Sequence, residues 1–125
     1  MASLDGKRIL VVEDEMLISA MLEDMLADLG AIVVGPAATV ADGLRLARSE
    51  TLDAAVLDVN VRDQRIDPVA DVLVERRIPM VFATGYGQSA ILAVRGALIL
   101  DKPYTKERVE TALVRCLAVK PTDEG

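Results

Sequence analysis

The chain has 125 residues, a net charge of −6, no histidine and one cysteine, Cys116. Without histidine it lacks the groups for Ser-His-Asp or Cys-His catalysis, for histidine metal sites and for carrying phosphohistidine. A single thiol forms no internal disulfide, which suits a reducing compartment. The 14 basic residues are scattered along an acidic chain, which argues against binding to a nucleic-acid backbone.

Apolar residues are numerous enough for one aliphatic core. They make up 52% of the chain, and its aromatic residues are Phe82, Tyr86 and Tyr104. No signal-peptide pattern is visible, and the longest charge-free stretch, residues 78–94, is shorter than the ~20 apolar residues of a membrane helix. We therefore expect a soluble, cytoplasmic protein with a single domain over residues 1–125, a core at about 7–119 and no output domain.

Strand-like and helix-like segments alternate along the chain. Short apolar or β-branched runs predict strands at residues 8–12, 31–35, 54–59, 80–84 and 97–100. Apolar residues at helical spacing predict helices at residues 15–29, from 39 or 41 to 49, at 67–77 and from 105 to 117. Residues 60–67 are expected to form a polar loop, 85–96 a loop with a short helix, and 120–125 a frayed tail.

Residues at the ends of these segments predict where the helices begin and end. Asp14 is placed to cap the first helix and Gly30 to end it. Asp67 is expected to cap the third helix, with Pro68 at its first position, and Thr105 to cap the last. The first helix carries an apolar stripe that we expect to face the core, formed by Leu17, Ile18, Met21, Leu22, Met25, Leu26 and Leu29.

The alternation predicts an α/β fold, a doubly wound parallel sheet with helices on both faces. The run at residues 54–59 is apolar without alternation, as in a strand covered on both faces. With right-handed crossovers, the common order for five strands is 2-1-3-4-5, the flavodoxin-like arrangement. In that order, the carboxyl ends of strands 1 and 3 flank the ligand crevice.

Three carboxylates collect at this crevice. Glu13 and Asp14 follow the first strand, and Asp58 lies near the end of the third. Each alone is compatible with a helix cap or a solvated acid, but side by side they would repel one another strongly. A hard divalent cation would remove that repulsion, and Mg²⁺ fits better than Ca²⁺ because few protein oxygens are available and water can complete its octahedron.

Two more polar groups are predicted at the same edge of the sheet. The Thr84 hydroxyl ends the fourth strand, and Lys102, followed by Pro103, ends the fifth. Metal-binding carboxylates, a hydroxyl and an ammonium around one further carboxylate are the groups that phosphoryl transfer requires. We expect Asp58 to act as the nucleophile, giving an aspartyl phosphate whose oxygens are neutralised by the cation and Lys102.

Four short motifs, at the ends of four successive strands, resemble the receiver domains of bacterial two-component response regulators. They are Val12-Glu13-Asp14-Glu15, Leu57-Asp58-Val59-Asn60, Ala83-Thr84-Gly85 and Asp101-Lys102-Pro103-Tyr104. The resemblance covers about residues 7–119, and the four motifs in this order are specific where each alone is not.

For the metal, the resemblance implies Mg²⁺ bound directly by Asp14 and Asp58. It also implies a contact from Glu13 through water and a ligand from the backbone carbonyl of Asn60.

For the phosphoryl group, the resemblance implies that Asp58 accepts it from a histidine kinase or a histidine phosphotransfer protein. Thr84 would bond the group and reorient on activation, and Lys102 would pair with one of its oxygens. The Lys102–Pro103 bond would be cis, a form that is affordable before proline.

Two departures from typical receivers bear on activation. Lys102 follows Thr84 by only 18 residues, so the fourth helix is expected to be short or irregular. Ile99 stands where receivers usually carry the aromatic residue that swings inward with the threonine, so the usual switch cannot operate. Together with residues 82–86, Phe-Ala-Thr-Gly-Tyr, this resembles the FAT GUY regulators, frequent in alphaproteobacteria and often paired with HWE-type kinases. Tyr86 would either anchor its loop or screen the phosphoryl group from water.

The sequence therefore predicts a single-domain response regulator that is not an enzyme beyond its own Mg²⁺-dependent phosphorylation and dephosphorylation. It would signal by protein contact, or serve as a phosphorelay shuttle or sink. Three alternatives stay open. A haloacid dehalogenase-type phosphatase would need a DxDx[TV] signature, which Glu13–Met16 does not supply, and a flavodoxin-type binder would need a Ser/Thr/Gly-rich phosphate loop. The third is a binding module that works without phosphorylation.

Overall fold

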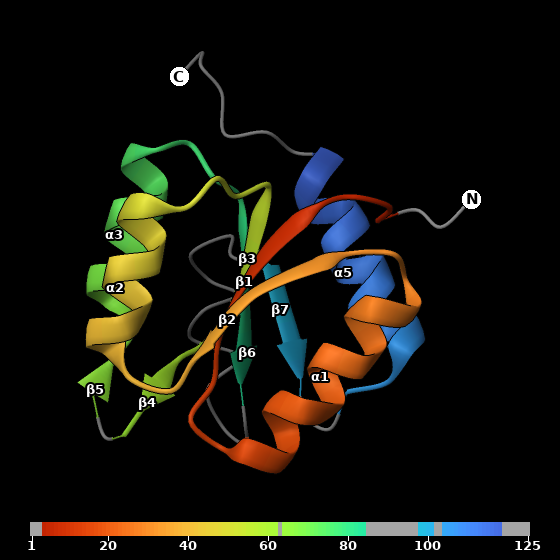
Figure 1. The fold of residues 1–125 in the computed structure, drawn as a ribbon, viewed down its shortest axis with the longest axis horizontal. Helices are drawn as coiled ribbons and strands as arrows, with labels where there is room; N and C mark the ends of the chain where they lie inside the picture. Colours follow the sequence, from red (N-terminus) through yellow and green to blue (C-terminus); the bar gives the residue numbers. More distant parts are fainter. Residues whose placement is uncertain (1–3, 63, 85–97, 102–103, 119–125) are drawn as a thin grey trace.

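The computed structural model describes residues 4–62, 64–84, 98–101 and 104–118. A central sheet separates two helical layers (Figure 1), with α1 (Met16–Asp28) and α5 (Lys106–Ala118) on one face and α2 (Val40–Ser49) and α3 (Asp67–Glu75) on the other. Five parallel strands form the sheet in the order β2-β1-β3-β6-β7. They are β1 (Arg8–Val12), β2 (Ile32–Ala37), β3 (Ala54–Asp58), β6 (Met80–Thr84) and β7 (Leu98–Asp101). The predicted α/β class and order 2-1-3-4-5 are confirmed.

The core lies on both faces of the sheet. Along β1, Ile9 and Val11 pack with α1 and α5, whereas Leu10 and Val12 pack with α2 and α3. This alternation explains why the central strands read as continuous apolar runs. Cys116 belongs to the first of these layers at 1% exposure, where burial raises the pKa of its thiol to about 12, so it acts as a small apolar filler.

Two helices end with the same arrangement of backbone hydrogen bonds. After α1, the Gly30 N–H donates to the Ala27 carbonyl at 3.0 Å, and the Ala31 N–H donates to the Leu26 carbonyl at 2.9 Å. This is a Schellman motif, and Gly30 takes its left-handed position with φ +87°, as predicted. After α3, the same left-handed position falls to Arg77, with φ 60°. The first motif is therefore relaxed, and the second forces a side chain into a conformation that favours glycine.

We expect Arg77→Gly to stabilise the chain. It removes the left-handed penalty of Arg77, and after the extra entropy of glycine in the unfolded chain the net gain is about 0.5–1 kcal/mol in unfolding free energy. Urea denaturation measures the gain. The matched control is Arg48→Gly, an exposed position inside α2, where the same substitution should cost about 1 kcal/mol. A loss of stability in Arg77→Gly would contradict the strain.

The predicted starts of two helices are wrong. The N-cap residue of α1 is Glu15, and Asp14 instead accepts a hydrogen bond from the Arg62 N–H at 2.9 Å. Asp67 is the first residue of α3 rather than its cap, because Ile66 occupies the cap position. Thr39 caps α2 as one of the two predicted starts, since its hydroxyl oxygen accepts from the Asp42 N–H at 3.1 Å. Thr105 caps α5 as predicted, because its hydroxyl oxygen accepts from the Arg108 N–H at 3.2 Å.

The segment expected to be a polar loop is partly ordered as a hairpin. Strand β4 (Asn60–Val61) pairs antiparallel with β5 (Gln64–Arg65) in a separate two-stranded sheet. Val61 and Ile66 are buried with α3 and β3, which holds the hairpin against the body of the domain. The polar residues of this segment hid the two apolar anchors, so a loop was the natural sequence-based expectation.

The apolar stripe of α1 is only partly a core face. Leu22 and Leu26 are buried, whereas Leu17 is 80% exposed and Met21 is 47% exposed. Met16, at the first position of the helix, is 84% exposed. The expectation that Leu17 and Met21 face the core is therefore wrong, and the first half of α1 carries an exposed apolar patch of Met16, Leu17 and Met21, called here the α1 patch.

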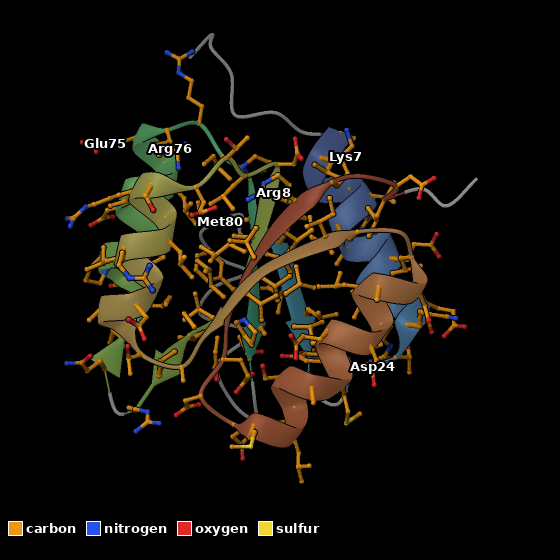
Figure 2. All side chains as sticks on the ribbon, viewed as in Figure 1. Lys7, Arg8, Asp24, Glu75, Arg76 and Met80 are labelled. Atoms are coloured by element: carbon orange, nitrogen blue, oxygen red, sulfur yellow. The ribbon has the colours of Figure 1, made fainter. Side chains whose placement is uncertain are left out.

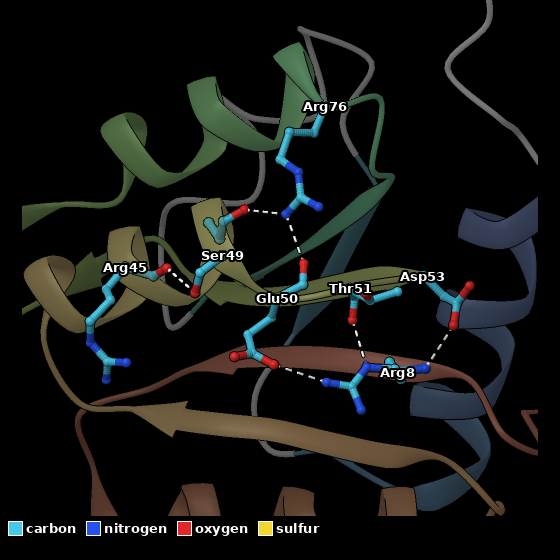
Figure 3. A network of polar contacts seen from close by, with 8 residues as sticks. Arg8, Arg45, Ser49, Glu50, Thr51, Asp53 and Arg76 are labelled. Carbon is cyan, nitrogen blue, oxygen red and sulfur yellow. Dashed lines mark hydrogen bonds and ion pairs between the residues drawn. The ribbon is translucent and has the colours of Figure 1, made fainter.

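At the amino ends of β1 and β3, polar contacts hold the connection from α2 to β3 (Figures 2 and 3). At the start of β1, the Arg8 Nε donates to the Thr51 carbonyl at 2.7 Å, and its guanidinium pairs with Glu50 at 3.0 Å. The Arg8 N–H donates to the Asp53 carboxylate at 2.8 Å, and Arg76 donates to the Glu50 carbonyl at 2.9 Å. This network fixes the amino ends of the strands, away from the predicted site.

Some predictions fall on other parts of the chain. The short fourth helix, expected within residues 85–96, and the tail at 120–125 lie outside the described residues. Among the helices in the part of the chain that the structure describes, none is long and apolar enough to cross a membrane.

Candidate metal and phosphoryl site

Three acidic side chains meet where β1 and β3 end. The parallel pairing of Val12 with Leu57 places Glu13 and Asp58 at neighbouring strand ends. One carboxylate oxygen from each of Glu13, Asp14 and Asp58 lies within 4.8 Å of the other two. Glu13 is 3% exposed, Asp58 is 8% exposed and Asp14 is half-buried. The structure thus brings together the three carboxylates that the sequence placed at the crevice.

Backbone groups orient two of these carboxylates. The Glu15 N–H donates to Oε2 of Glu13 at 3.1 Å, and the Arg62 N–H donates to Oδ2 of Asp14 at 2.9 Å. The Glu13 N–H donates to the Ala37 carbonyl at the end of β2, at 2.9 Å. Because backbone donors hold them, the carboxylates are positioned before any cation arrives.

The hairpin contributes to the site through Arg62, a role that the sequence did not reveal. Arg62 has φ 51°, and its Nε donates to the Ala38 carbonyl at 3.2 Å. That contact joins the hairpin to the segment after β2, while the Arg62 backbone holds Asp14. Arg62 lies between Val61 and Asp63 in the sequence, and an arginine gives no sequence signal of a left-handed conformation, which glycine adopts most readily.

Tyr104 is a second group whose place at the site the sequence did not predict. Its side chain is buried, and its hydroxyl makes no well-formed hydrogen bond to any residue that the structure describes. Burial, and then the negative charges of Glu13 and Asp58, raise the pKa of Tyr104 far above its ordinary value of 10.0. Contact with the Glu13 carboxylate acts in the same direction. The phenol therefore stays protonated and offers a donor toward the acidic cluster.

This raised pKa predicts how the chain responds to alkali. Above the ordinary tyrosine pKa near 10, the unfolded chain releases the phenol proton and the folded chain keeps it, so folding stability falls as pH rises further. In Tyr86→Phe, where Tyr104 is the only tyrosine, tyrosinate absorbance should appear only together with loss of the native circular dichroism. Tyrosinate formed in a still-folded chain would contradict the burial.

Thr84 lies at the end of β6, fully buried, and its hydroxyl has a partner in the next strand. Thr84 Oγ1 donates to Oδ1 of Asp101 at 3.2 Å, and the two residues are register partners between β6 and β7. Ile99 is half-buried on β7, where it lines a groove between β7 and α5. The place of Ile99 in activation stays a prediction.

Several predicted site residues lie outside the described part of the chain. These are Tyr86, Lys102 and Pro103, with the cis bond expected between the last two. The backbone of Asn60 is described as the start of β4, close in sequence to Asp58. The roles predicted for the site residues all stay predictions.

The donor set of the acidic cluster fits a hard divalent cation. Carboxylate oxygens are the ligands that Mg²⁺ prefers, and few of them are needed because water completes the coordination. Three carboxylates held this close repel one another when no cation is between them. The buried Tyr104 hydroxyl adds a neutral donor beside the cluster and not a competing positive charge.

Comparisons with known proteins find SdrG, a response regulator receiver protein and a regulator named PhyR among the relatives of this chain. SdrG from Sphingomonas melonis Fr1 is 43% identical, with a TM-score of 0.80 over 95% of this chain and 100% of that chain. A response regulator receiver protein from Sinorhizobium medicae WSM419 is 25% identical, with a TM-score of 0.80 over 94% of this chain and 98% of that chain. The Phyllosphere-induced regulator PhyR from Methylorubrum extorquens is 29% identical over 87% of this chain and 43% of its own length. No model of a known protein family matches the chain.

The fold and the receiver-domain relatives are those of a signalling domain. By its likeness to SdrG over nearly its whole length, together with the receiver structures, the chain belongs to the response regulator receiver family. It spans less than half the length of the curated relatives that it matches. The narrower resemblance to the FAT GUY subgroup stays a prediction.

Proposed function

We propose that this domain accepts a phosphoryl group on Asp58 from a phosphohistidine of a partner protein, in a reaction that depends on Mg²⁺. The observation that carries the proposal is the cluster of the buried Glu13 and Asp58 and the half-buried Asp14 at the ends of β1 and β3. These 125 residues contain no histidine, so the donor imidazole would lie outside this domain.

The residues of the cluster would divide the work. Asp14, Asp58 and the Asn60 carbonyl would bind the cation directly, with Glu13 contacting it through water. When bound, Mg²⁺ supplies positive charge beside the phosphoryl oxygens and relieves the repulsion among the carboxylates. The backbone N–H groups of Glu15 and Arg62 keep Glu13 and Asp14 in position throughout.

The transfer itself is a displacement at phosphorus. A carboxylate oxygen of Asp58 forms the new P–O bond, the P–N bond to the donor imidazole breaks, and its electron pair returns to the imidazole nitrogen. Lys102 would pair with a phosphoryl oxygen, and the Thr84 hydroxyl would donate to another. The domain would then act by contact with protein partners, as a switch, a shuttle or a sink.

The α1 patch supports a protein as the donor. Met16 and Leu17 are 84% and 80% exposed on the first turn of α1, and Met16 is two residues after Asp14. Exposed apolar side chains grouped beside a reactive site are typical of protein-binding surfaces. The occupant that we propose is the histidine-bearing helical region of a sensor kinase or phosphotransfer protein.

Intact-mass analysis tests this function. After incubation with acetyl phosphate and Mg²⁺, the chain should gain the mass of one phosphate, and chelation of the metal beforehand should prevent the gain. Asp58→Asn should gain none, while Asp53→Asn, an acid at the other end of β3, should be labelled like the parent. Labelling that survives in Asp58→Asn, or its absence in the parent with both acetyl phosphate and a phosphohistidine donor, would overturn the proposal.

A further inference from the structure

The Thr84 hydroxyl already donates a hydrogen bond in this structure. Its proton is directed to Oδ1 of Asp101, 3.2 Å away on the neighbouring strand. The two Cα atoms are register partners, so the contact follows from the parallel pairing of β6 with β7. Thr84 is 1% exposed, whereas Asp101 is an exposed residue at the sheet edge. A buried hydroxyl is thus tied to a carboxylate that water can reach.

This contact competes with the use of Thr84 in phosphoryl binding. A threonine hydroxyl has one proton, so it donates to one acceptor at a time. An aspartate carboxylate only accepts, so Asp101 cannot return a proton to Thr84 or to a phosphoryl oxygen. A phosphoryl group on Asp58 that takes the Thr84 donor must therefore displace Asp101. The exposed Asp101 carboxylate can replace its lost partner with water, which keeps the exchange reversible.

We propose that Asp101 is a positioning residue that holds the Thr84 hydroxyl away from the phosphoryl site in the unphosphorylated domain. The inference rests on the proposed function, because the cost of releasing Thr84 matters only if a phosphoryl group arrives at Asp58. In this chain, Ile99 on β7 stands where receivers usually carry the aromatic switch residue. An exchange of the Thr84 hydroxyl from Asp101, on the same strand, to the phosphoryl group would provide a local switch in its place. Phosphorylation would move the hydroxyl from Asp101 to the phosphoryl group.

Beryllofluoride, a phosphoryl mimic, measures this restraint. We expect Asp101→Ala to bind beryllofluoride with Mg²⁺ about 3- to 10-fold more tightly than the parent, the range of a hydrogen bond to a charged group that solvent weakens. Asp101→Asn should fall between the two, since an amide oxygen accepts more weakly. Glu107→Gln is the matched control: it removes an exposed carboxylate that lines the same groove as Asp101, and its affinity should equal that of the parent.

A double-mutant cycle separates the hydrogen bond from simple charge repulsion. In the isosteric Thr84→Val background, where no hydroxyl remains, Asp101→Ala should leave the affinity unchanged. A gain of the same size in that background would show that Asp101 acts by its charge, and would overturn the inference. Equal affinities of the parent, Asp101→Asn and Asp101→Ala would also overturn it.

A second measurement needs no phosphoryl mimic. Three-bond NMR couplings in the metal-free chain should give one χ1 rotamer for Thr84 in the parent and an average over rotamers in Asp101→Ala. An unchanged rotamer would show that Asp101 does not position the hydroxyl. If instead the parent failed to bind beryllofluoride at all, the proposed function would be contradicted before any Asp101 variant was compared.

Discussion

Asp14→Asn is expected to stabilise the metal-free chain and, at the same time, to abolish its response to Mg²⁺. The carboxylate of Asp14 lies with those of Glu13 and Asp58 inside a 4.8 Å cluster, so removing one charge relieves repulsion that only a cation otherwise relieves. The amide oxygen of asparagine can still accept the hydrogen bond from the Arg62 N–H. We expect a gain of roughly 1–2 kcal/mol in unfolding free energy under chelation, because Asp14 is half-buried and partly screened.

The same substitution removes a metal ligand, and the chemistry should fail accordingly. Labelling by acetyl phosphate should fall by about 100-fold or more, since the cation contributes several kcal/mol to a phosphoryl transfer. Urea denaturation with chelator and with Mg²⁺ gives the two stabilities, and intact mass gives the labelling rate.

Asp24→Asn is the matched control for this pair of effects. Asp24 is an exposed acid on α1, labelled in Figure 2, and it does not belong to the metal cluster. Its replacement should change neither the Mg²⁺ response nor the labelling rate. If Asp14→Asn kept the Mg²⁺-dependent stabilisation of the parent, the assignment of the cluster as a metal site would be wrong.

The double variant Met16→Ala/Leu17→Ala is expected to slow transfer from a phosphohistidine protein by about tenfold or more, because two exposed anchors of an interface are lost. Labelling by acetyl phosphate should stay within about twofold, since a small donor does not need the α1 patch. Alanine favours a helix, so α1 should be preserved. Rates of phosphotransfer from a phosphorylated histidine kinase, compared with rates from acetyl phosphate, check both halves.

Val74→Ala is the control for the α1 patch. Val74 is 64% exposed on α3, which packs on the opposite face of the sheet from α1. Losing its apolar surface should leave both rates unchanged. Equal slowing with both donors in the α1 variant would point to damage at the site instead of a lost docking surface.

The carboxylate cluster was predictable because parallel strands deliver their ends to one edge of the sheet. The apolar runs predicted the positions of β1 and β3. Glu13 and Asp14, which follow β1, were therefore expected to lie near Asp58 at the end of β3. Gly30 was also predictable, because glycine has no side chain and readily adopts the left-handed conformation that ends a helix. The sequence was therefore sufficient to predict a feature where the residue type alone determines it.

Features that depend on register or on missing cover were not predictable. The periodicity of α1 includes Leu17, but Leu17 is 80% exposed because no neighbouring element among the described residues covers the first turn well enough to bury it. The Thr84–Asp101 contact depends on which residues of β6 and β7 pair. Arg62 and Arg77 adopt left-handed conformations that cannot be predicted from an arginine in the sequence.

Asp58 itself is expected to carry the phosphoryl group. Borohydride reduction of the chain after labelling with acetyl phosphate and Mg²⁺ converts an aspartyl phosphate into homoserine, and peptide mass spectrometry then locates it. We predict homoserine at position 58, and none there when Mg²⁺ is chelated. Homoserine at another aspartate such as Asp14, the five-carbon alcohol that reduction of a phosphorylated Glu13 would give, or a stable phosphate on a hydroxyl residue would contradict it.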